Sequence, residues 1–201
     1  MTTDERQWLS WICENSDPKE LEKKYNTWAE TYETDVKKDW SFMPVQIAKV
    51  IESILSNKQA VILDAGAGTG LVGEALFQRG YTHLIAADLS DKMLEIAGQK
   101  QVYKALQRGN LDDPQLFTSG DQFDVIIAAG VFAYAHAGVS VLNNLFRFLK
   151  SGGLFVLTIR EDYQPQMQSA FEALPWRLVI QEQYKIYDGQ QIMSILGFRK
   201  N

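Results

Sequence analysis

The segment Val61–Gly70 constrains the fold more than any other part of the chain. It places Gly66, Gly68 and Gly70 directly after a short apolar run rich in β-branched residues. Such a run is typical of a strand covered on both faces. Glycine permits a sharp turn and has no Cβ to hold a ligand away, and the start of a helix presents unpaired N–H groups. The segment therefore predicts a ligand-binding turn between a buried strand and a helix. The alternative is a glycine turn that only lets the two elements pack closely.

The pattern after this turn alternates between strand-like and helix-like stretches. Strands are predicted at 60–65, 83–88, 103–107, 123–129 and 153–160, and helices at 71–79, 92–100 and 139–149. This alternation favours βαβ units and a parallel sheet. Two extended runs, 176–187 and 190–199, meet at Asp188-Gly189, a dipeptide that favours a hairpin turn. The predicted fold is α/β: a Rossmann-like doubly wound sheet, mostly parallel, with a C-terminal antiparallel hairpin.

The residues before the first predicted strand have helical periodicity. One periodic stretch runs from Pro18 through Tyr32, and a strongly amphipathic helix follows Pro44, which suits a helix start. The chain has no internal repeat, no low-complexity tract and no linker rich in Pro, Gly or Ser. We therefore expect an N-terminal helical extension over 1–44, which acts as a lid, and a single globular unit over 45–201.

Composition narrows the class of protein. A chain of 201 residues with 46% hydrophobic and 22% charged residues fits one soluble domain. Its single cysteine, Cys13, predicts a reducing compartment, and the polar first residues lack the apolar core of a secretory signal. Because no apolar stretch approaches the ~20 residues of a membrane span, we expect a cytoplasmic protein. A net charge of −5 with scattered Lys and Arg argues against nucleic acid as a partner. A monomer and a homodimer both remain open.

Two cofactor classes use a glycine turn of this kind. The segment 68–73 is a formal G-x-G-x-x-G, and Asp88 lies about twenty residues further on, as in dinucleotide-binding proteins. However, the strand is expected to end by Ala65, so the turn begins at Gly66, too early for the dinucleotide frame. Asp64 suits the ammonium group of methionine and would repel two phosphates. We therefore favour S-adenosylmethionine as the cofactor, with a nicotinamide-dependent oxidoreductase as the alternative.

Polar residues also close the next two predicted strands. Asp88 can accept both hydroxyls of a ribose, which both cofactor classes carry, so it does not discriminate between them. After the third strand, Asn110 or Asp112 can hydrogen-bond an adenine amino group, while Leu111 and Met93 pack on the ring. The alternative for these acids is a helix cap or a polar turn without a ligand.

Five motifs in order along the chain are similar to those of class I S-adenosylmethionine-dependent methyltransferases. They are Leu63-Asp64-Ala65-Gly66-Ala67-Gly68-Thr69-Gly70, Ala87-Asp88-Leu89-Ser90, Gly109-Asn110-Leu111-Asp112, Phe123-Asp124-Val125-Ile126 and Leu149-Lys150-Ser151-Gly152-Gly153-Leu154. The resemblance covers the chain from about Tyr25 to its C-terminus. Segments 25–36 and 130–137 further resemble the methyltransferase-like family named for the Williams-Beuren syndrome region and its bacterial relatives. Tyr134 departs from that family, which commonly has His there.

The resemblance implies a set of cofactor contacts. The methionine portion would lie at Asp64, Gly66 and Gly70, the ribose at Asp88, and the transferable methyl group beside the end of the fourth strand. The full set of implied cofactor-binding residues is Tyr25, Trp28, Tyr32, Asp64, Ala65, Gly66, Gly68, Gly70, Asp88, Leu89, Met93, Asn110, Leu111, Asp112, Ala129, Gly130 and Val131. The three N-terminal aromatic residues would lie on one helix over the cofactor. Their helical spacing equally fits a stripe that only packs in the core.

Methyl transfer from a sulfonium is an in-line displacement, so alignment and exclusion of water supply much of the catalysis. A general base is needed only if the nucleophile is protonated. His136 is then the candidate, because it follows the fourth strand and titrates near neutrality. A surface histidine without a role is the alternative.

Aromatic and basic residues are candidates for the acceptor side. Phe132, Tyr134 and Tyr163 would supply an aromatic wall, and Trp40 would close the pocket from the N-terminal side. Arg160 can pair with a substrate carboxylate. Its alternative is an ion pair with an adjacent acid, Glu161 or Asp162.

The predicted reaction is methyl transfer from S-adenosylmethionine to the oxygen or nitrogen of a small molecule. A non-catalytic module that only binds the cofactor is a second possibility. A protein or RNA methyltransferase is a third. The absence of a basic run weighs against RNA, and Gly130-Val131-Phe132 stands where an Asn/Asp-Pro-Pro-Tyr motif for amino groups of bases would lie.

Overall fold

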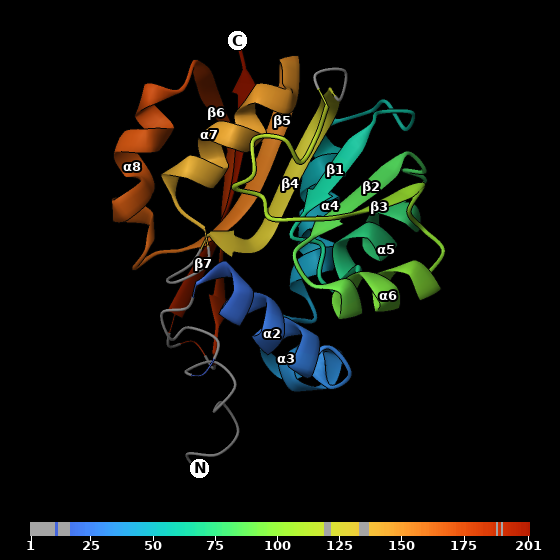
Figure 1. Cartoon of the computed structure of the whole chain (residues 1–201). Helices are drawn as coiled ribbons and strands as arrows, with labels where there is room; N and C mark the ends of the chain where they lie inside the picture. Colours follow the sequence, from blue (N-terminus) through green and yellow to red (C-terminus); the bar gives the residue numbers. More distant parts are fainter. Residues whose placement is uncertain (1–10, 12–16, 119–121, 133–136, 188, 190) are drawn as a thin grey trace.

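The computed structural model describes residues 11, 17–118, 122–132, 137–187, 189 and 191–201 (Figure 1). Its helices are α2 (Pro18–Trp28), α3 (Tyr32–Trp40), α4 (Met43–Ile54), α5 (Leu71–Phe77), α6 (Asp91–Gln99), α7 (Val139–Phe148) and α8 (Gln164–Ala173). Its strands are β1 (Ile62–Ala65), β2 (Leu84–Asp88), β3 (Ala105–Arg108), β4 (Phe123–Phe132), β5 (Leu149–Arg160), β6 (Trp176–Ile186) and β7 (Gln191–Lys200). In the described part of the chain, no helix combines the length and apolar character that a bilayer crossing requires.

Seven strands form one sheet in the order β3-β2-β1-β4-β5-β7-β6. The neighbours from β3 to β5 are parallel, whereas β7 is antiparallel to both β5 and β6. The predicted parallel sheet with a C-terminal antiparallel hairpin is therefore confirmed. The strand order runs outward from β1 in one direction and from β4 in the other. In sheets of this type, ligands bind beyond the carboxyl ends of the strands at that switch point.

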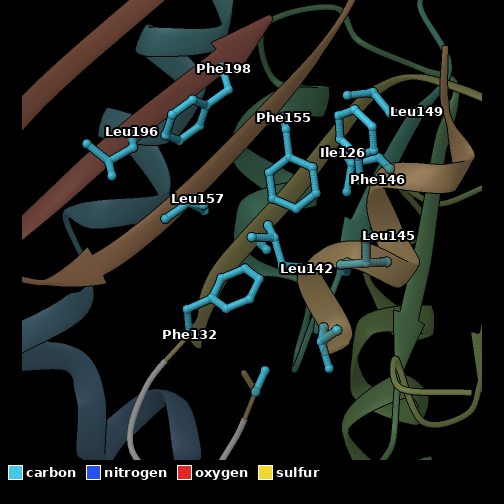
Figure 2. Packing of buried hydrophobic residues seen from close by; sticks show 14 of the residues in the cluster. Ile126, Phe132, Leu142, Leu145, Phe146, Leu149, Phe155, Leu157, Leu196 and Phe198 are labelled. Atoms are coloured by element: carbon cyan, nitrogen blue, oxygen red, sulfur yellow. The ribbon is translucent and has the colours of Figure 1, made fainter. Parts of the chain in front are cut away.

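Alternate side chains of the central strands build two apolar layers. On β5, Phe155 and Leu157 belong to the layer under α7 and α8, whereas Leu154 and Val156 belong to the layer under α4 and α5. This period of two is the mark of a strand buried on both faces. Figure 2 shows the first layer, with Leu142 of α7 lying beside Phe155. The rigid two-sided core holds the strand ends in place.

Several element boundaries differ from the prediction. β3 begins two residues later than expected and β5 begins already at Leu149, directly after α7. β4 continues to Phe132, because Ala128 pairs with Leu157 and Phe132 with Ile159, which leaves 129–131 opposite Thr158 alone. Helix α8 was not predicted from the sequence pattern.

The sequence predicted one helical stretch from Pro18 through Tyr32, but the helix that begins at Pro18 already ends at Trp28. The chain turns after Trp28, and Tyr32 begins a second helix. The side chain of Asp35 explains the turn, because its Oδ2 accepts hydrogen bonds from Thr31 Oγ1 at 2.8 Å and from Trp28 Nε1 at 2.7 Å. In Figure 1, α2 and α3 lie across the end of the sheet toward which β4 points.

Candidate active site

A cavity lies at the carboxyl ends of the parallel strands and is lined by α2 and α3 on its other side. The predicted cofactor residues that line it are Tyr25, Trp28, Tyr32, Gly66, Gly68, Asp88, Leu89, Met93, Asn110, Leu111, Ala129, Gly130 and Val131. Of the predicted substrate residues, Phe132 and Arg160 line it. The predicted positions Tyr134 and His136 lie outside the described residues. The structure thus gathers most of the predicted site around one hollow.

The glycine turn after β1 forms one wall of this cavity. Gly66 has a φ of +74°, and a Cβ at this position would overlap the Val131 side chain. Gly68 has a φ of +54°, and a Cβ there would meet no atom within 4 Å. Both backbones are in a region that non-glycine residues rarely adopt. The first glycine therefore permits close packing against the end of β4, whereas the second leaves open space for a ligand.

Asp88 lies at the end of β2, directly beside the glycine turn. Its Oδ2 accepts a hydrogen bond from Gly68 N and its Oδ1 accepts one from Ser90 N, at 2.8 and 2.9 Å. Burial raises the pKa of this carboxyl, and the backbone N–H groups of Ser90, Gly68 and Leu89 oppose that rise. A carboxylate oxygen has further lone pairs for a ligand, so Asp88 can both fix the turn and accept hydroxyl donors from the cavity.

Asp64, Ala65 and Gly70 do not line the cavity. Asp64 is 1% exposed and lies behind the turn, where its Oδ2 accepts a hydrogen bond of 2.6 Å from the Tyr103 hydroxyl. Burial raises the pKa of Asp64 to about 6; the nearby Asp88 adds to this, whereas the Tyr103 hydroxyl and the Gly73 N–H lower it. Gly70 caps α5 with a φ of +87°. These residues support the turn from behind.

The segment after β3 supplies another wall. Asn110 and Leu111 line the cavity, whereas Asp112 is exposed and does not. Asn110 Oδ1 accepts a hydrogen bond from Asp112 N at 3.0 Å. Asn144 of α7 donates to the carbonyl oxygens of Leu111 at 2.7 Å and of Asp113 at 3.0 Å. Of the predicted residues in this segment, Asn110 and Leu111 therefore face the cavity, whereas Asp112 faces away from it.

The end of β4 lines the cavity and contains a β-bulge. Residues 129–131 stand opposite Thr158 alone, and Gly130 N donates to Thr158 Oγ1 at 2.8 Å. A bulge of this kind re-aims the chain. Gly130 has a φ of +72°, and a Cβ there would lie 3.6 Å from the Trp40 ring. Thr158 lines the cavity and was not predicted as a site residue.

The aromatic residues of the N-terminal segment cover the cavity from two helices instead of one. The rings of Tyr25 and Trp28 stack with centroids 6.1 Å apart, and Tyr32 meets Trp28 edge to face at 4.8 Å. Burial and the nearby Asp88 carboxylate raise the pKa of Tyr32. These three aromatic residues therefore pack against one another and also line the cavity. The two roles that the sequence offered as alternatives are compatible.

Polar contacts fasten α2 and α3 to α6 and β3. Asn26 Oδ1 accepts hydrogen bonds from Ser90 Oγ at 2.7 Å and from Lys92 N at 3.2 Å, at the start of α6. Glu22 forms an ion pair of 2.6 Å with Arg108, and Glu33 forms one of 3.2 Å with Lys100. The uncharged contact involves buried Ser90. The two ion pairs are partly exposed, and ion pairs that water can reach contribute little to stability.

The residues predicted for the acceptor include apolar rings and an arginine in an ion pair. Arg160 donates to both carboxylate oxygens of Asp162, one of the alternatives that the sequence left open. Trp40 lines the cavity as expected. Tyr163 does not: it packs in the core and donates to Ala137 O at 3.3 Å. Phe132 is 1% exposed and its ring lies 6.5 Å from that of Phe155 (Figure 2).

Several cavity residues could not be found by sequence reasoning. Tyr187 and Met193 come from the C-terminal hairpin, and Val36 and Asp39 come from α3. Asp39 is 7% exposed. Tyr187 has a φ of +51°, which is unusual for a residue with a side chain. In the sequence, these four residues lie in ordinary amphipathic segments. No motif there distinguishes them from residues that only pack in the core.

Comparisons with known proteins agree with this geometry. A family model for the methyltransferase domain matches residues 63–157. The chain is 30% identical to human methyltransferase-like protein 27 over 82% of this chain and 67% of that protein. It is 24% identical to the malonyl-[acyl-carrier protein] O-methyltransferase of Bacillus anthracis over 87% of this chain and 64% of that enzyme. The chain thus spans about two thirds of the length of these curated relatives.

A solved structure supports the same fold. Magnesium protoporphyrin IX methyltransferase from Synechocystis PCC 6803, with bound S-adenosylhomocysteine, superposes with a TM-score of 0.74. The match covers 92% of this chain and 100% of that chain at 13% identity. At this identity the likeness concerns the fold alone.

Proposed function

The chain belongs to the class I S-adenosylmethionine-dependent methyltransferases, and on that premise we propose that it transfers the cofactor's methyl group to a small-molecule acceptor. One observation carries the proposal. The lining of a single cavity includes both the glycine turn with Asp88 and the apolar residues Trp40 and Phe132. The turn and Asp88 offer groups that the cofactor needs, and the apolar residues offer a place for an acceptor.

The residues around the turn fit S-adenosylmethionine. The open space at Gly68 admits a ligand close to the backbone, and Asp88 suits the ribose hydroxyls. We propose that Asn110 and Leu111 contact the adenine, and that Tyr25, Trp28 and Tyr32 cover the cofactor as part of a lid formed within residues 1–44. When bound, the cofactor supplies an activated methyl group on a sulfonium.

The chain's own contribution is alignment and exclusion of water. The bulge at 129–131, held by Thr158, would set the position of the acceptor relative to the turn. Trp40, Phe132 and Met193 favour an apolar or aromatic acceptor body. Arg160 remains a candidate for an acidic group, but its pairing with Asp162 offsets its charge. His136 stays a candidate base for a protonated acceptor.

A small acceptor is favoured by the cover over the site. α2 and α3 contribute Tyr25, Trp28, Tyr32, Val36, Asp39 and Trp40 to the cavity lining. A site roofed in this way suits a molecule that can be enclosed better than a segment of a large polymer. The relatives are named for different acceptors, so their names do not select one acceptor for this chain.

We further propose a cytoplasmic location, because the chain has a single cysteine and so cannot form an internal disulfide.

Methyl transfer can be measured with radiolabelled S-adenosylmethionine and a panel of small aromatic and apolar acids, phenols and amines. We expect label to move to at least one compound of the panel. The control is the Asp88→Ala variant, which should transfer none. Tight cofactor binding with no transfer to this panel or to a metabolite extract would contradict the proposal and favour a non-catalytic binding module.

A further inference from the structure

The residue Asp39 is a buried acid that lines the cavity near the end of α3. It is 7% exposed, and Val36 and Trp40 of the same helix line the cavity beside it. Residues three and four positions apart lie on one face of a helix, so these three side chains share the face that is turned toward the cavity. Among the residues with which α3 lines the cavity, Asp39 is the charged one.

The stability of α3 gives no reason for an acid at this position. Asp39 lies in the last turn of the helix, where the backbone dipole favours cations and disfavours anions. The exposed positions of the same turn follow this rule, because they hold Lys37 and Lys38. A buried carboxylate at the unfavourable end of a helix costs free energy. Its position therefore indicates a role in the cavity.

The contacts of the adjacent Trp40 place the end of α3 beside the bulge of β4. A Cβ at Gly130 would lie 3.6 Å from the Trp40 ring. Gly130 belongs to the bulge that Thr158 holds, and both residues line the cavity. Because methyl transfer is expected beside this part of β4, the end of α3 borders the acceptor.

The C-terminal hairpin brings an aromatic ring toward α3. Gly189 N donates to Ile186 O at 3.0 Å, so Tyr187 lies in a tight turn, and its φ is +51°. Glycine, asparagine and aspartate are the usual residues in this conformation, and a bulky residue adopts it only where its surroundings hold it. Burial, the Asp88 carboxylate and the nearby Tyr187 hydroxyl raise the pKa of Tyr32 on α3. Tyr187 thus lines the cavity close to α3.

The charges around the cavity favour some acceptors over others. Arg160, the basic residue in the described lining, donates to both carboxylate oxygens of Asp162, which offsets its charge. The Asp39 carboxylate accepts hydrogen bonds only, and it has more lone pairs than one partner uses. It attracts a hydrogen-bond donor and repels another carboxylate. A molecule with an N–H or O–H group therefore fits better than an acid.

We propose that Asp39 is a specificity-determining residue that accepts a hydrogen bond from the hydroxyl or amino group of the acceptor. The acceptor is then an apolar molecule that carries such a donor, and Trp40 and Tyr187 pack against its apolar body. This inference deepens the proposed function and rests on it, because it takes a small molecule as the acceptor.

The test applies the panel of labelled methyl transfer to the wild-type chain and to Asp39→Asn, which keeps the shape of the side chain and removes its charge. We expect the wild type to label phenols or amines in preference to acids with the same ring. Asp39→Asn should raise the KM of the preferred compound by about tenfold or more, as for one hydrogen bond to a charged group. The affinity of that compound for the complex with S-adenosylhomocysteine, in which no transfer occurs, should fall by a similar factor.

Two further variants separate specificity from stability. Asp39→Glu keeps a carboxylate and should retain the preference for donors. The matched control is Glu95→Gln, which removes one negative charge from an exposed position of α6 outside the cavity lining. It should leave the KM within about twofold. Asp39→Asn and Glu95→Gln should both bind S-adenosylhomocysteine as the wild type does. Circular dichroism checks their folding, and Asp39→Ala replaces Asp39→Asn if that variant does not fold.

Three results would overturn the inference. They are an unchanged KM in Asp39→Asn, a wild-type preference for acids, and an equal loss of affinity for S-adenosylhomocysteine, which would indicate that Asp39 only supports α3. Each of the first two leaves methyl transfer to a small molecule intact. If label moves to no compound at all, the proposed function fails first, and this inference fails with it.

Discussion

Replacing Asp88 with alanine is expected to weaken the binding of S-adenosylhomocysteine by about a hundredfold. The carboxylate accepts Gly68 N and Ser90 N, and it lines the cavity where a ribose would lie. Hydrogen bonds to a charged group are worth about 1.5–3 kcal/mol each, and about 2.7 kcal/mol corresponds to a hundredfold change in affinity. The substitution also releases the glycine turn. Isothermal titration at fixed pH and salt measures the loss.

Asp112→Ala is the matched control for this prediction. Asp112 is an acid after the next strand, but it is exposed and does not line the cavity. Its removal should leave the affinity within about twofold, as for surface substitutions generally. Comparable losses for Asp88→Ala and Asp112→Ala would show that general charge, and not the position beside the turn, governs binding.

Replacing Phe155 with alanine is expected to lower the free energy of unfolding by about 3–5 kcal/mol. The side chain is 0% exposed, and its ring lies 5.6 Å from that of Trp176 and 6.5 Å from that of Phe132. These two neighbouring rings are held by β6 and β4 of one rigid sheet, so they cannot close the space. For a chain of this size the midpoint of thermal unfolding should fall by roughly 10 °C or more.

Thermal and urea unfolding followed by circular dichroism measure this effect. Phe77→Ala on α5 is the control, because that ring is 43% exposed. It should cost less than about 1 kcal/mol. Equal destabilisation by both substitutions would contradict tight packing in the layer under α7 and α8.

Local patterns were enough to predict the parallel sheet and the glycine turn. A short apolar strand, a glycine turn and an amphipathic helix lie next to one another in sequence, so the region around Gly66 needs no knowledge of distant contacts. The same holds for Asp88 at the end of β2. Because strand ends of a parallel sheet meet at one edge, these local predictions also located the cavity.

Features that depend on distant contacts could not be predicted. The helix break before Tyr32 depends on the Asp35 side chain, although neither glycine nor proline marks it. The longer β4 depends on Thr158, which anchors the bulge from a neighbouring strand. Tyr187 reaches the site only because the hairpin folds back beside β5. For the same reason Asp64 was expected in the cavity, although the Tyr103 contact holds it behind the turn.

The choice of cofactor is the central claim, and isothermal titration of the intact chain tests it most directly. The glycine turn beside Asp88 should bind S-adenosylhomocysteine with micromolar or tighter affinity and should not bind NADH. Binding of NADH without binding of S-adenosylhomocysteine would contradict the claim and restore the dinucleotide interpretation of segment 68–73.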